Sequence, residues 1–416
     1  MSRLQELINK LCPNGVEFKP LGELGEFFGG LTGKSKEDFK DGNAKFITYM
    51  NVYSNPSLIT EISDFVKVSS SEKQNTVRKG DILFTGSSET PEECGITSVV
   101  TQEIKEPLYL NSFCFGLRLK TPQKFNPDFL KHYLRSYEMR HKISKTASGV
   151  TRFNISKTRL AKVEIPIPPI EVQEEIVRIL DKFSNYAAEL QAELQARKEQ
   201  YEYYRNLLLT FNPSACGCGT DDKQEIKDVT AWGGASYKIQ WKTINDFAKV
   251  LRGKRLTKDK LDSINTYAVY HGGLVPLGYF DDYNREANTV MIINVGASAG
   301  TVGFCDKKFW SSDGCYCISH SEKILNKFLY YYLSNNQIYF ISKVRHAGIP
   351  TLDSTVIGNY RVPIPPLELQ EKIVSILDRF ETLVNDLTNG LPAEIAAIKE
   401  QYEYYRNKLL TFKKIA

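Results

Sequence analysis

Long apolar runs and recognisable catalytic motifs are both missing from this 416-residue sequence. No uninterrupted apolar run approaches the roughly 20 residues that a transmembrane helix needs. The first residues, MSRLQELINKLCPNG, form a charged amphipathic pattern rather than an apolar signal core followed by a small-residue cleavage site. The sequence therefore predicts a cytoplasmic protein with no membrane partner.

Motifs for catalysis fail one by one. The five histidines form no His-Glu-x-x-His cluster, and no serine lies in a Gly-x-Ser-x-Gly elbow. FFGGLTGKS at Phe27–Ser35 ends like a phosphate-binding loop, but Phe28 stands where that motif needs glycine. Pro91 and Glu92, followed by Glu103, match a nuclease spacing only loosely, and the signatures of a DNA methyltransferase are missing. We therefore expect no catalytic residue in this chain.

Cysteine spacing argues against a metal site. The eight cysteines include two Cys-x-Cys pairs, Cys216/Cys218 and Cys315/Cys317, about a hundred residues apart. Structural zinc sites usually use pairs separated by two to four residues. Reduced thiols without bound metal are the expectation.

The sequence does contain an internal repeat, in which the same order of segments occurs twice. The longest recurring segment is PIPP followed by a helical pattern, and each copy leads to an identical nonapeptide and a Leu-Leu-Thr-Phe tail. A weaker echo precedes both copies. The recurring segments are VEIPIPPIEVQEEIVRILDKF (163–183) with YRVPIPPLELQEKIVSILDRF (360–380), KEQYEYYRN (198–206 and 399–407), and FKPLGELGEFFGG (18–30) with WKTINDFAKVLRG (241–253).

Each PIPP segment opens a long helical pattern. Apolar residues step by four and three, which predicts a coiled-coil seam. The first helix should run from Glu171 to Phe211, ~60 Å at 1.5 Å per residue. In the second copy, four extra residues fall around Asn389, Gly390 and Pro392, where we expect a kink or a short break. The first seam comprises Ile176, Leu180, Phe183, Ala187, Leu190, Leu194, Arg197, Tyr201, Tyr204, Leu208 and Phe211.

The regions before the long helices mix short β-like runs with turn residues, and each should close with a helix. The β-like runs are AKFITYM, GDILFTG and TVMIINVG, and the closing helices are expected at Phe129–His141 and Lys323–Lys343. Asn212–Ser236, small, polar and Gly-rich, is expected to be a linker. The predicted divisions are residues 1–165 (a globular domain with an N-terminal helix), 166–231 (helix and linker), 232–365 (a second globular domain) and 366–416 (the C-terminal helix).

Charge separates these parts. The globular regions 1–165 and 232–365 carry net charges of +5 and +6, and the rest of the chain carries −6. Basic domains suit a polyanion, whereas acidic helices suit protein contacts. Random variation of the surface is the alternative, because +5 on 165 residues is modest.

Two loops placed alike before the long helices are candidate DNA contacts. ASGVTRFN (147–154) and HAGIPTLD (346–353) follow basic residues, and Arg, Lys, Asn and Thr can bind phosphates and base edges. The alternative is that these loops only pack each domain against its helix. On charge and loop position, the candidate DNA-binding residues are Lys34, Lys36, Arg78, Lys79, Lys145, Arg152, Asn154, Lys157, Arg252, Lys254, Arg255, Lys258, Lys343, Arg345 and His346.

The twofold plan, the two PIPP helices and the N-terminal LCPNGVEFKPLGEL resemble the specificity subunits of Type I restriction–modification systems over nearly the whole chain. The resemblance implies an α+β fold with two pseudo-repeated target recognition domains joined by two long antiparallel coiled-coil helices. Each domain would read one half of a split target in double-stranded DNA, and the helices would set the spacing. In that family the subunit is non-catalytic. Two modification subunits methylate adenine with S-adenosylmethionine, and restriction subunits use ATP and Mg²⁺ to translocate and cleave.

We interpret the identical nonapeptides as two docking sites for two identical modification subunits. Seam packing accounts for their alternate tyrosines but not for their outward-facing positions. Recent recombination between the copies is the alternative. The candidate partner-binding residues are Glu202, Tyr203, Arg205, Asn206, Glu403, Tyr404, Arg406 and Asn407.

Two other functions stay open at this point. A stand-alone DNA-modifying or DNA-cleaving enzyme would form product from the isolated chain with DNA, Mg²⁺ and S-adenosylmethionine. A structural coiled-coil protein would leave the two dissimilar basic domains unexplained.

Overall fold

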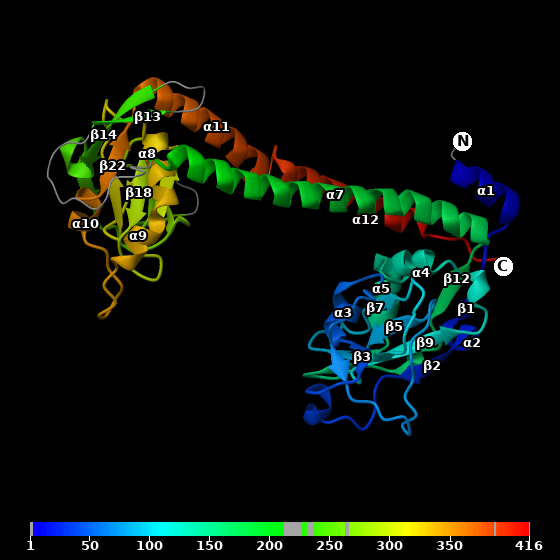
Figure 1. Ribbon diagram of the computed structural model, residues 1–416. Coiled ribbons are helices and arrows are strands. Elements are labelled where there is room, and N and C mark those ends of the chain that lie inside the picture. The colour runs from blue at the N-terminus through cyan, green and yellow to red at the C-terminus, as the bar shows by residue number, and fades with distance from the viewer. Residues whose placement is uncertain (1–2, 212–225, 231–235, 263–265, 387, 416) are drawn as a thin grey trace. The chain divides into compact units, whose positions relative to one another are not determined.

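The computed structural model describes residues 3–211, 226–230, 236–262, 266–386 and 388–415 (Figure 1). The chain divides into two compact units. Unit 1 comprises Met1–Gln191 with Glu394–Ala416, and unit 2 comprises Ala192–Ala393. Each unit therefore combines one globular region with parts of both repeated helical segments.

Helix α7 (Ile170–Leu209) is the first long helix and confirms that prediction to within two residues at each end. Pro168 and Pro169 immediately precede it. Every residue of its predicted seam is buried or half-buried. Of the helices in the described part of the chain, none is both long and apolar enough to cross a membrane.

The second long helix is interrupted, as the sequence predicts. Helix α11 (Leu367–Asn385) ends at Asp386, and α12 (Leu391–Leu409) begins five residues later. The Asp386 carboxylate accepts hydrogen bonds from the Thr388 hydroxyl and from the backbone N–H groups of Thr388 and Asn389, and these bonds lower its pKa to about 2. Gly390 is required there, because a Cβ would lie 2.5 Å from the carbonyl oxygen of Thr382.

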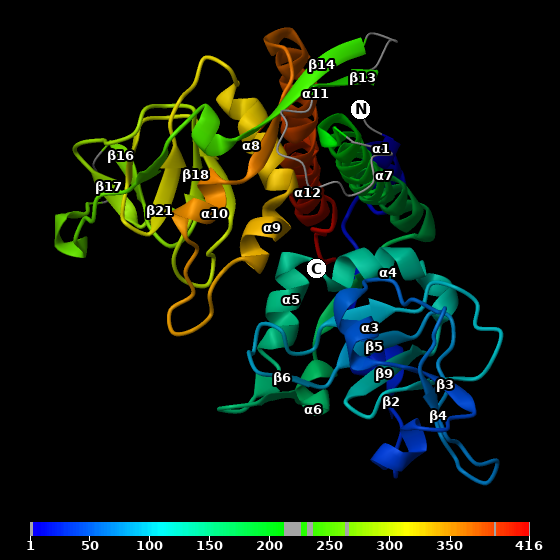
Figure 2. The ribbon, with the colours of Figure 1, turned by 60° about the vertical axis from the view of Figure 1, so that its left-hand side comes forward.

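The globular part of unit 1 is a set of small sheets covered by helices (Figure 2). A four-stranded sheet has the order β2-β9-β5-β7, and α4 packs against β7. A second sheet has the order β4-β3-β8, with β3 and β8 parallel, and a third has the order β10-β11-β6. Strand β1 pairs with β12.

The elements of unit 1 other than the long helices are α1 (Arg3–Leu11), β1 (Glu17–Pro20), α2 (Leu21–Leu24), β2 (Gly25–Gly29), β3 (Ala44–Ile47), α3 (Tyr49–Ser54), β4 (Phe65–Val66), β5 (Ile82–Thr85), β6 (Ser87–Ser88), β7 (Thr97–Val99), β8 (Leu108–Leu110), β9 (Cys114–Leu119), α4 (Pro127–Leu134), α5 (Tyr137–Ser144), β10 (Ala147–Ser148), β11 (Phe153–Ile155), α6 (Lys157–Leu160) and β12 (Glu164–Ile167).

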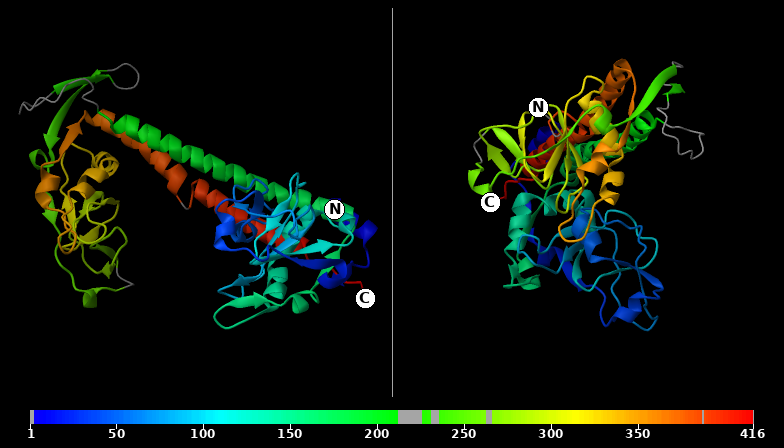
Figure 3. Two further views of the ribbon diagram at one scale, coloured as in Figure 1. Left: turned by 60° about the horizontal axis from the view of Figure 1, so that its bottom comes forward. Right: turned by 90° about the vertical axis from the view of Figure 1, so that its left-hand side faces the viewer.

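Unit 2 repeats the topology of the four-stranded sheet and of the sheet with one parallel pair. Its main sheet has the order β15-β21-β18-β19, and its second sheet, β17-β16-β20, again contains one parallel pair, β16 with β20. Helix α8 packs on β18 and β19 (Figure 3). The place of β10-β11-β6 is taken by single bridges from Thr351 to Arg345 and to Val295.

The elements of unit 2 are β13 (Ile226–Thr230), β14 (Ser236–Thr243), β15 (Val250–Arg252), β16 (Tyr267–Tyr270), β17 (Gly278–Phe280), β18 (Thr289–Ile293), β19 (Val302–Cys305), β20 (Phe309–Ser311), β21 (Cys315–Ile318), α8 (Asn326–Asn335), α9 (Gln337–Ser342), α10 (Ser354–Gly358), β22 (Arg361–Ile364) and α11.

The shared topology explains the weak echo between 18–30 and 241–253. Each segment contains the first strand of a four-stranded sheet, β2 or β15. Each ends in a glycine that packs against the loop before the neighbouring strand of that sheet, β9 or β21. A Cβ on Gly30 would lie 2.0 Å from the carbonyl oxygen of Asn111, and one on Gly253 would lie 1.9 Å from that of Ser312. Only glycine lets the backbones approach so closely.

Three sequence predictions are corrected. The expected helix Phe129–His141 is two helices, α4 and α5, because the Ser136 hydroxyl caps α5 and the Arg135 guanidinium bonds the carbonyls of Val52, Tyr53 and Thr97. The expected helix Lys323–Lys343 is likewise divided into α8 and α9 at Asn336, which has φ −105° and ψ 17°.

The third correction concerns the linker Asn212–Ser236. Ile226–Thr230 within it form β13, which pairs with β14. Residues 212–225 and 231–235 lie outside the described residues.

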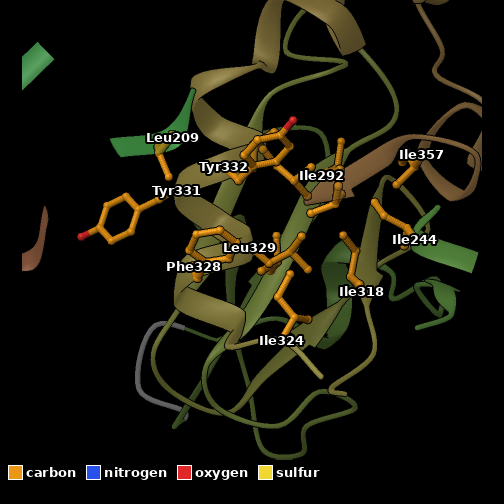
Figure 4. Close-up of a cluster of buried hydrophobic side chains, with 14 of the residues drawn as sticks. Leu209, Ile244, Ile292, Ile318, Ile324, Phe328, Leu329, Tyr331, Tyr332 and Ile357 are labelled. Atoms are coloured by element: carbon orange, nitrogen blue, oxygen red, sulfur yellow. The ribbon is translucent and has the colours of Figure 1, made fainter. Parts of the chain in front are cut away.

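The Leu-Leu-Thr-Phe tails exchange partners between the two copies. Phe211, at the end of the first long helix, packs in unit 2 against Phe328 of α8, with ring centroids 6.0 Å apart. Phe412, at the end of the second, packs in unit 1 against Phe129 of α4, 6.1 Å away. Leu209 joins the buried cluster of unit 2, with α8, β18, β21 and α10 (Figure 4). Each core is therefore completed by the helix that follows the other domain.

A fully buried glutamine joins each PIPP segment to its domain. In unit 1, the Gln173 Oε1 accepts the N–H of Asn126 at 2.8 Å, and its Nε2 donates to the carbonyls of Lys124 and Pro168 at 2.8 and 2.7 Å. These backbone groups lie beside the starts of α4 and α7. The glutamine thus satisfies backbone polar groups of the segments that lead into both helices.

Gln370 makes the same three bonds in unit 2. Its Oε1 accepts the N–H of Leu325 at 2.8 Å, and its Nε2 donates to the carbonyls of Lys323 and Pro365 at 3.2 and 2.7 Å. The repeated glutamine of PPIEVQ and PPLELQ is therefore a structural residue.

The aspartate of ILDKF and ILDRF also binds its domain, through different partners in the two units. Asp181 faces His132 Nε2 at 2.8 Å, and His132 Nδ1 faces the Tyr402 hydroxyl at 2.8 Å. In unit 2 the Tyr331 hydroxyl takes the place of His132 and lies 2.5 Å from Asp378 Oδ1 and 2.6 Å from Glu381 Oε2. Figure 4 shows this hydroxyl directed away from the sheet.

We predict that Gln173→Leu and Gln370→Leu each lower the free energy of unfolding by roughly 3 kcal/mol, because each leaves three backbone groups buried without partners. Urea unfolding of the full chain measures this. Glu174→Gln and Glu371→Gln, at the next, exposed positions, are the matched controls. Leucine variants as stable as these controls would contradict the role of the glutamines.

We also predict that acid loosens unit 1 before unit 2. Burial is the main cause that lowers the pKa of His132, and the charge of Lys131 acts in the same direction. The carboxylates of Asp181 and Asp128 oppose this shift. The unfolded chain then binds a proton at a higher pH than the folded chain does, so stability falls as the pH drops from about 7 through ~6.5.

Hydrogen exchange of α4 between pH 7 and 5 measures this effect. His132→Gln should remove the pH dependence, and α8, with Tyr331 in the corresponding place, should show none. Equal acid sensitivity of α4 and α8 would contradict the assignment to His132.

Candidate nucleic-acid interface

In unit 1, three of the predicted DNA-binding residues gather around one open pocket of about 270 Å³. Asn154 and Lys157 line it, and Arg152 lies beside it. The Arg152 guanidinium donates to Ser87 Oγ at 2.9 Å and lies 5.7 Å from the ring centroid of exposed Phe113. The full lining is Gly29, Gly30, Leu31, Thr32, Gly86, Ser112, Phe113, Cys114, Phe115, Asn154, Ile155 and Lys157.

This pocket combines cations with aromatic faces. The Lys157 ammonium lies 5.0 Å from the ring centroid of Phe115. Amide, ammonium and guanidinium groups bind phosphates and base edges, and aromatic rings stack on bases. Sequence reasoning missed Phe113, whose exposure follows from its place in the loop before β9.

Lys34 has a partner within the domain. Its side chain is only 6% exposed, and its ammonium lies 2.5 Å from Glu72 Oε2. This bond is the main cause that lowers the pKa of Glu72 to about 2. The neighbouring Lys36 is exposed, in a 3-10 turn at Lys36–Phe39.

The other candidates of unit 1 lie apart from the pocket lining. Arg78 and Lys79 are exposed in the turn before β5, and the Lys79 ammonium lies 3.1 Å from Glu103. Lys145 is exposed at the end of α5.

Unit 2 has a second pocket, of about 450 Å³, lined by a different set of residues. The predicted residues Arg255 and Lys258 line it together with His271 and Asp313, which the sequence reasoning missed. His271 Nδ1 accepts the N–H of Gly314 at 3.2 Å and lies 3.4 Å from Asp313 Oδ1. The remaining lining residues are Leu256, Thr257 and Leu277. No local sequence pattern marks His271 or Asp313, because they are far apart in the chain and only the fold brings them to one pocket.

The remaining predicted residues of unit 2 are exposed near this pocket or on the hairpin before α10. Arg252 and Lys254 flank Gly253. On this hairpin, Thr351 pairs with both Arg345 and Val295. Val295 is also close to Gly314, because a Cβ on Gly314 would lie 2.7 Å from the Val295 side chain. The segment that pairs with the hairpin therefore lies beside the loop that contains Asp313. The two other exposed candidates on this hairpin segment are Lys343 and His346.

The two nonapeptides divide into residues that hold their own unit together and residues that face outward. The Arg205 Nε donates to Asn335 Oδ1 of α8 at 3.0 Å. The Arg406 side chain is only 11% exposed, bonds Glu403 and lies 5.3 Å from the Tyr402 ring centroid. Asn407 Oδ1 accepts the N–H of Tyr137 at 3.4 Å.

Most outward-facing positions match between the two copies. Tyr203 is 63% exposed and Tyr404 is 60% exposed. The other exposed candidate partner residues are Glu202, Asn206, Glu403 and Asn407. Tyr204 and Tyr405 pack in the seam instead, on Phe380 at 5.7 Å and Phe183 at 5.2 Å.

The sequence matches the family described as "Type I restriction modification DNA specificity domain" over residues 13–200 and 238–397. The two matched segments define a protein with two DNA specificity domains. The chain belongs to the family of Type I restriction–modification specificity subunits, as the resemblance in its repeats indicated.

Relatives and solved structures agree. The Escherichia coli EcoR124I/EcoR124II specificity subunit is 32% identical over 284 residues, 62% of this chain and 65% of that subunit, so less than two thirds of that relative is covered. A putative type I specificity subunit of Mycoplasma pneumoniae, S.MpnORF615P, is 33% identical over 264 residues, 62% of this chain and 96% of the relative. The S subunit structure from M. genitalium has a TM-score of 0.56, 17% identity and 99% coverage of both chains, which shows the fold.

Proposed function

We propose that this chain is the non-catalytic DNA-recognition subunit of a Type I restriction–modification complex, and that each basic domain reads one half of a bipartite DNA target. One observation carries the proposal: two domains share a topology, yet their pockets have different linings. Asn154 and Phe113 line the first, and His271 and Asp313 line the second. A common scaffold with different side chains suits two different half-sites.

The long helices would set the distance between the half-sites. Helix α7 has 40 residues, which gives ~60 Å at 1.5 Å per residue. Apolar seam packing and the two buried glutamines support the rigidity that a spacer needs.

Catalysis would lie on other subunits of the complex. Two modification subunits would bind S-adenosylmethionine, and restriction subunits would use ATP and Mg²⁺. The sequence patterns support this division, because this chain lacks the motifs of a methyltransferase or nuclease.

The nonapeptides would dock the two modification subunits, through Tyr203 and Tyr404 rather than through their arginines. Exposed tyrosines are frequent anchors of protein interfaces. Arg205 and Arg406 contact groups of their own units, so charge reversal there is expected to weaken that packing as well.

Mapping N6-methyladenine in a host that carries this chain and its modification partner tests the recognition role. We expect methylation at one split motif. Arg152→Ala with Lys157→Ala should weaken duplex binding of the assembly by roughly 2 kcal/mol and reduce its salt dependence, because phosphate contacts are lost.

Lys10→Ala with Lys182→Ala, two exposed lysines of α1 and α7 outside the nonapeptides, is the matched control for that pair. Methylation without a split motif, or equal binding of target and random duplexes, would refute the recognition role.

We predict that Tyr203→Ala or Tyr404→Ala leaves one modification subunit bound, and that the double variant leaves none. Truncating an interface tyrosine of this kind costs roughly 2 kcal/mol or more. Native mass spectrometry counts the subunits, and Glu189→Ala, exposed on α7 outside the repeat, is the control. A double variant that still binds two subunits would place docking elsewhere.

A further inference from the structure

Each recognition domain carries a hairpin whose tip exposes one large aliphatic side chain. In unit 1, Ser148 pairs with Asn154, and residues 149–153 form tip 1. In unit 2, Arg345 pairs with Thr351, and residues 346–350 form tip 2, of equal length. Val150 on tip 1 is 91% exposed and Ile349 on tip 2 is 69% exposed. Such exposed side chains contribute little to the stability of the chain itself.

Both tips are built into the fold. Asn154 and Thr351 each pair with a third segment, at Ser87 and at Val295. Gly149 and Gly348 have φ values of 151° and 84°, which L side chains rarely adopt. Tip 1 is held further by the Arg152 guanidinium on Ser87 Oγ. The aliphatic side chains are therefore presented from fixed hairpins (tip 1 beside β6 in Figure 2, tip 2 before α10 in Figure 1).

The surroundings of the tips are basic. Lys145, Arg152 and Lys157 lie on or next to the first hairpin. Lys343, Arg345 and His346 occupy the corresponding place in the second, where the Arg345 guanidinium is 71% exposed and 3.9 Å from Asp353. An apolar point between cations complements duplex DNA, which has an anionic backbone around apolar base stacks.

The two tips resemble each other, because each has an exposed aliphatic side chain near cations, whereas the two pockets have different linings. A feature common to both domains cannot distinguish two half-sites, so it fits a task that is independent of the base sequence. Proteins that deform DNA often insert an apolar side chain between base pairs and hold the adjacent phosphates with cations.

We propose that Val150 and Ile349 are apolar wedges, one per domain, that insert into the base stack of each half-site and unstack one base step. The flanking cations hold the phosphates on either side. This inference rests on the proposed function, and it adds to each half-site a deforming contact that does not itself read the bases.

The test uses the chain assembled with its modification subunits and duplexes that carry the mapped target, with 2-aminopurine placed at successive positions. The wild-type assembly should raise the fluorescence at one step in each half-site, because the probe loses its stacking. Val150→Ala should abolish the rise in one half-site only, and Ile349→Ala in the other only. Each variant should bind the target roughly tenfold more weakly, since two or three buried carbons are lost.

Conservative exchanges and exposed residues elsewhere are the controls. Val150→Ile and Ile349→Val should keep the fluorescence rise. Met50→Ala in unit 1 and Ile338→Ala in unit 2 remove exposed apolar side chains away from the tips and should change neither signal nor affinity. Preference for target over mismatched duplex should be the same in wild type and in the tip variants.

Several results would overturn the wedge. A wild-type assembly that prefers its target but raises no fluorescence at any step refutes it while leaving the proposed function intact. The same holds if Val150→Ala and Ile349→Ala leave the rise unchanged. Loss of modification-subunit binding in these variants without DNA would assign the tips to a protein interface instead. An assembly with no target preference at all would count against the proposed function itself.

Discussion

The exchange of helix ends between the two copies is the constraint on which the rest of this structure depends. The first long helix begins on the core of unit 1 and ends in the core of unit 2, and the second does the reverse. Phe211 on Phe328 and Phe412 on Phe129 are the two equivalent closures. Neither domain completes its core with its own following helix alone. Changes that would shift one helix against the other are therefore opposed at two cores.

Buried polar groups make the same connections specific. Apolar packing alone tolerates sliding, whereas Gln173 and Gln370 each bind three backbone groups at fixed positions. The aspartates of ILDKF and ILDRF add a second polar contact, with His132 in one unit and Tyr331 in the other. The two PIPP segments are thus where each long helix is fixed to its domain. The loops beyond them are free to differ between the two domains.

Sequence periodicity predicted the elements whose formation depends on local pattern. The long seam, the extents of the helix that follows the first PIPP and the break near Gly390 all follow from apolar spacing, proline and glycine. The two closing helices were predicted as single elements. Their division depends on Ser136 and on the bonds of Arg135 to distant carbonyls, which no local pattern reveals. The sequence also could not show that Lys34 pairs with Glu72, because the two residues are far apart in the chain, and so Lys34 was predicted to contact DNA.

By itself the sequence determined the twofold plan, the family and the separation of basic domains from acidic helices, because repeats and charge are properties of the linear chain. Only the tertiary structure decided that the two dissimilar domains share one topology, since strand pairing joins residues far apart. It also decided which face of each nonapeptide is free. Arg205 and Arg406 bond groups within their own units, whereas Tyr203 and Tyr404 stay exposed, and this division depends on which surface of the helix the domain covers.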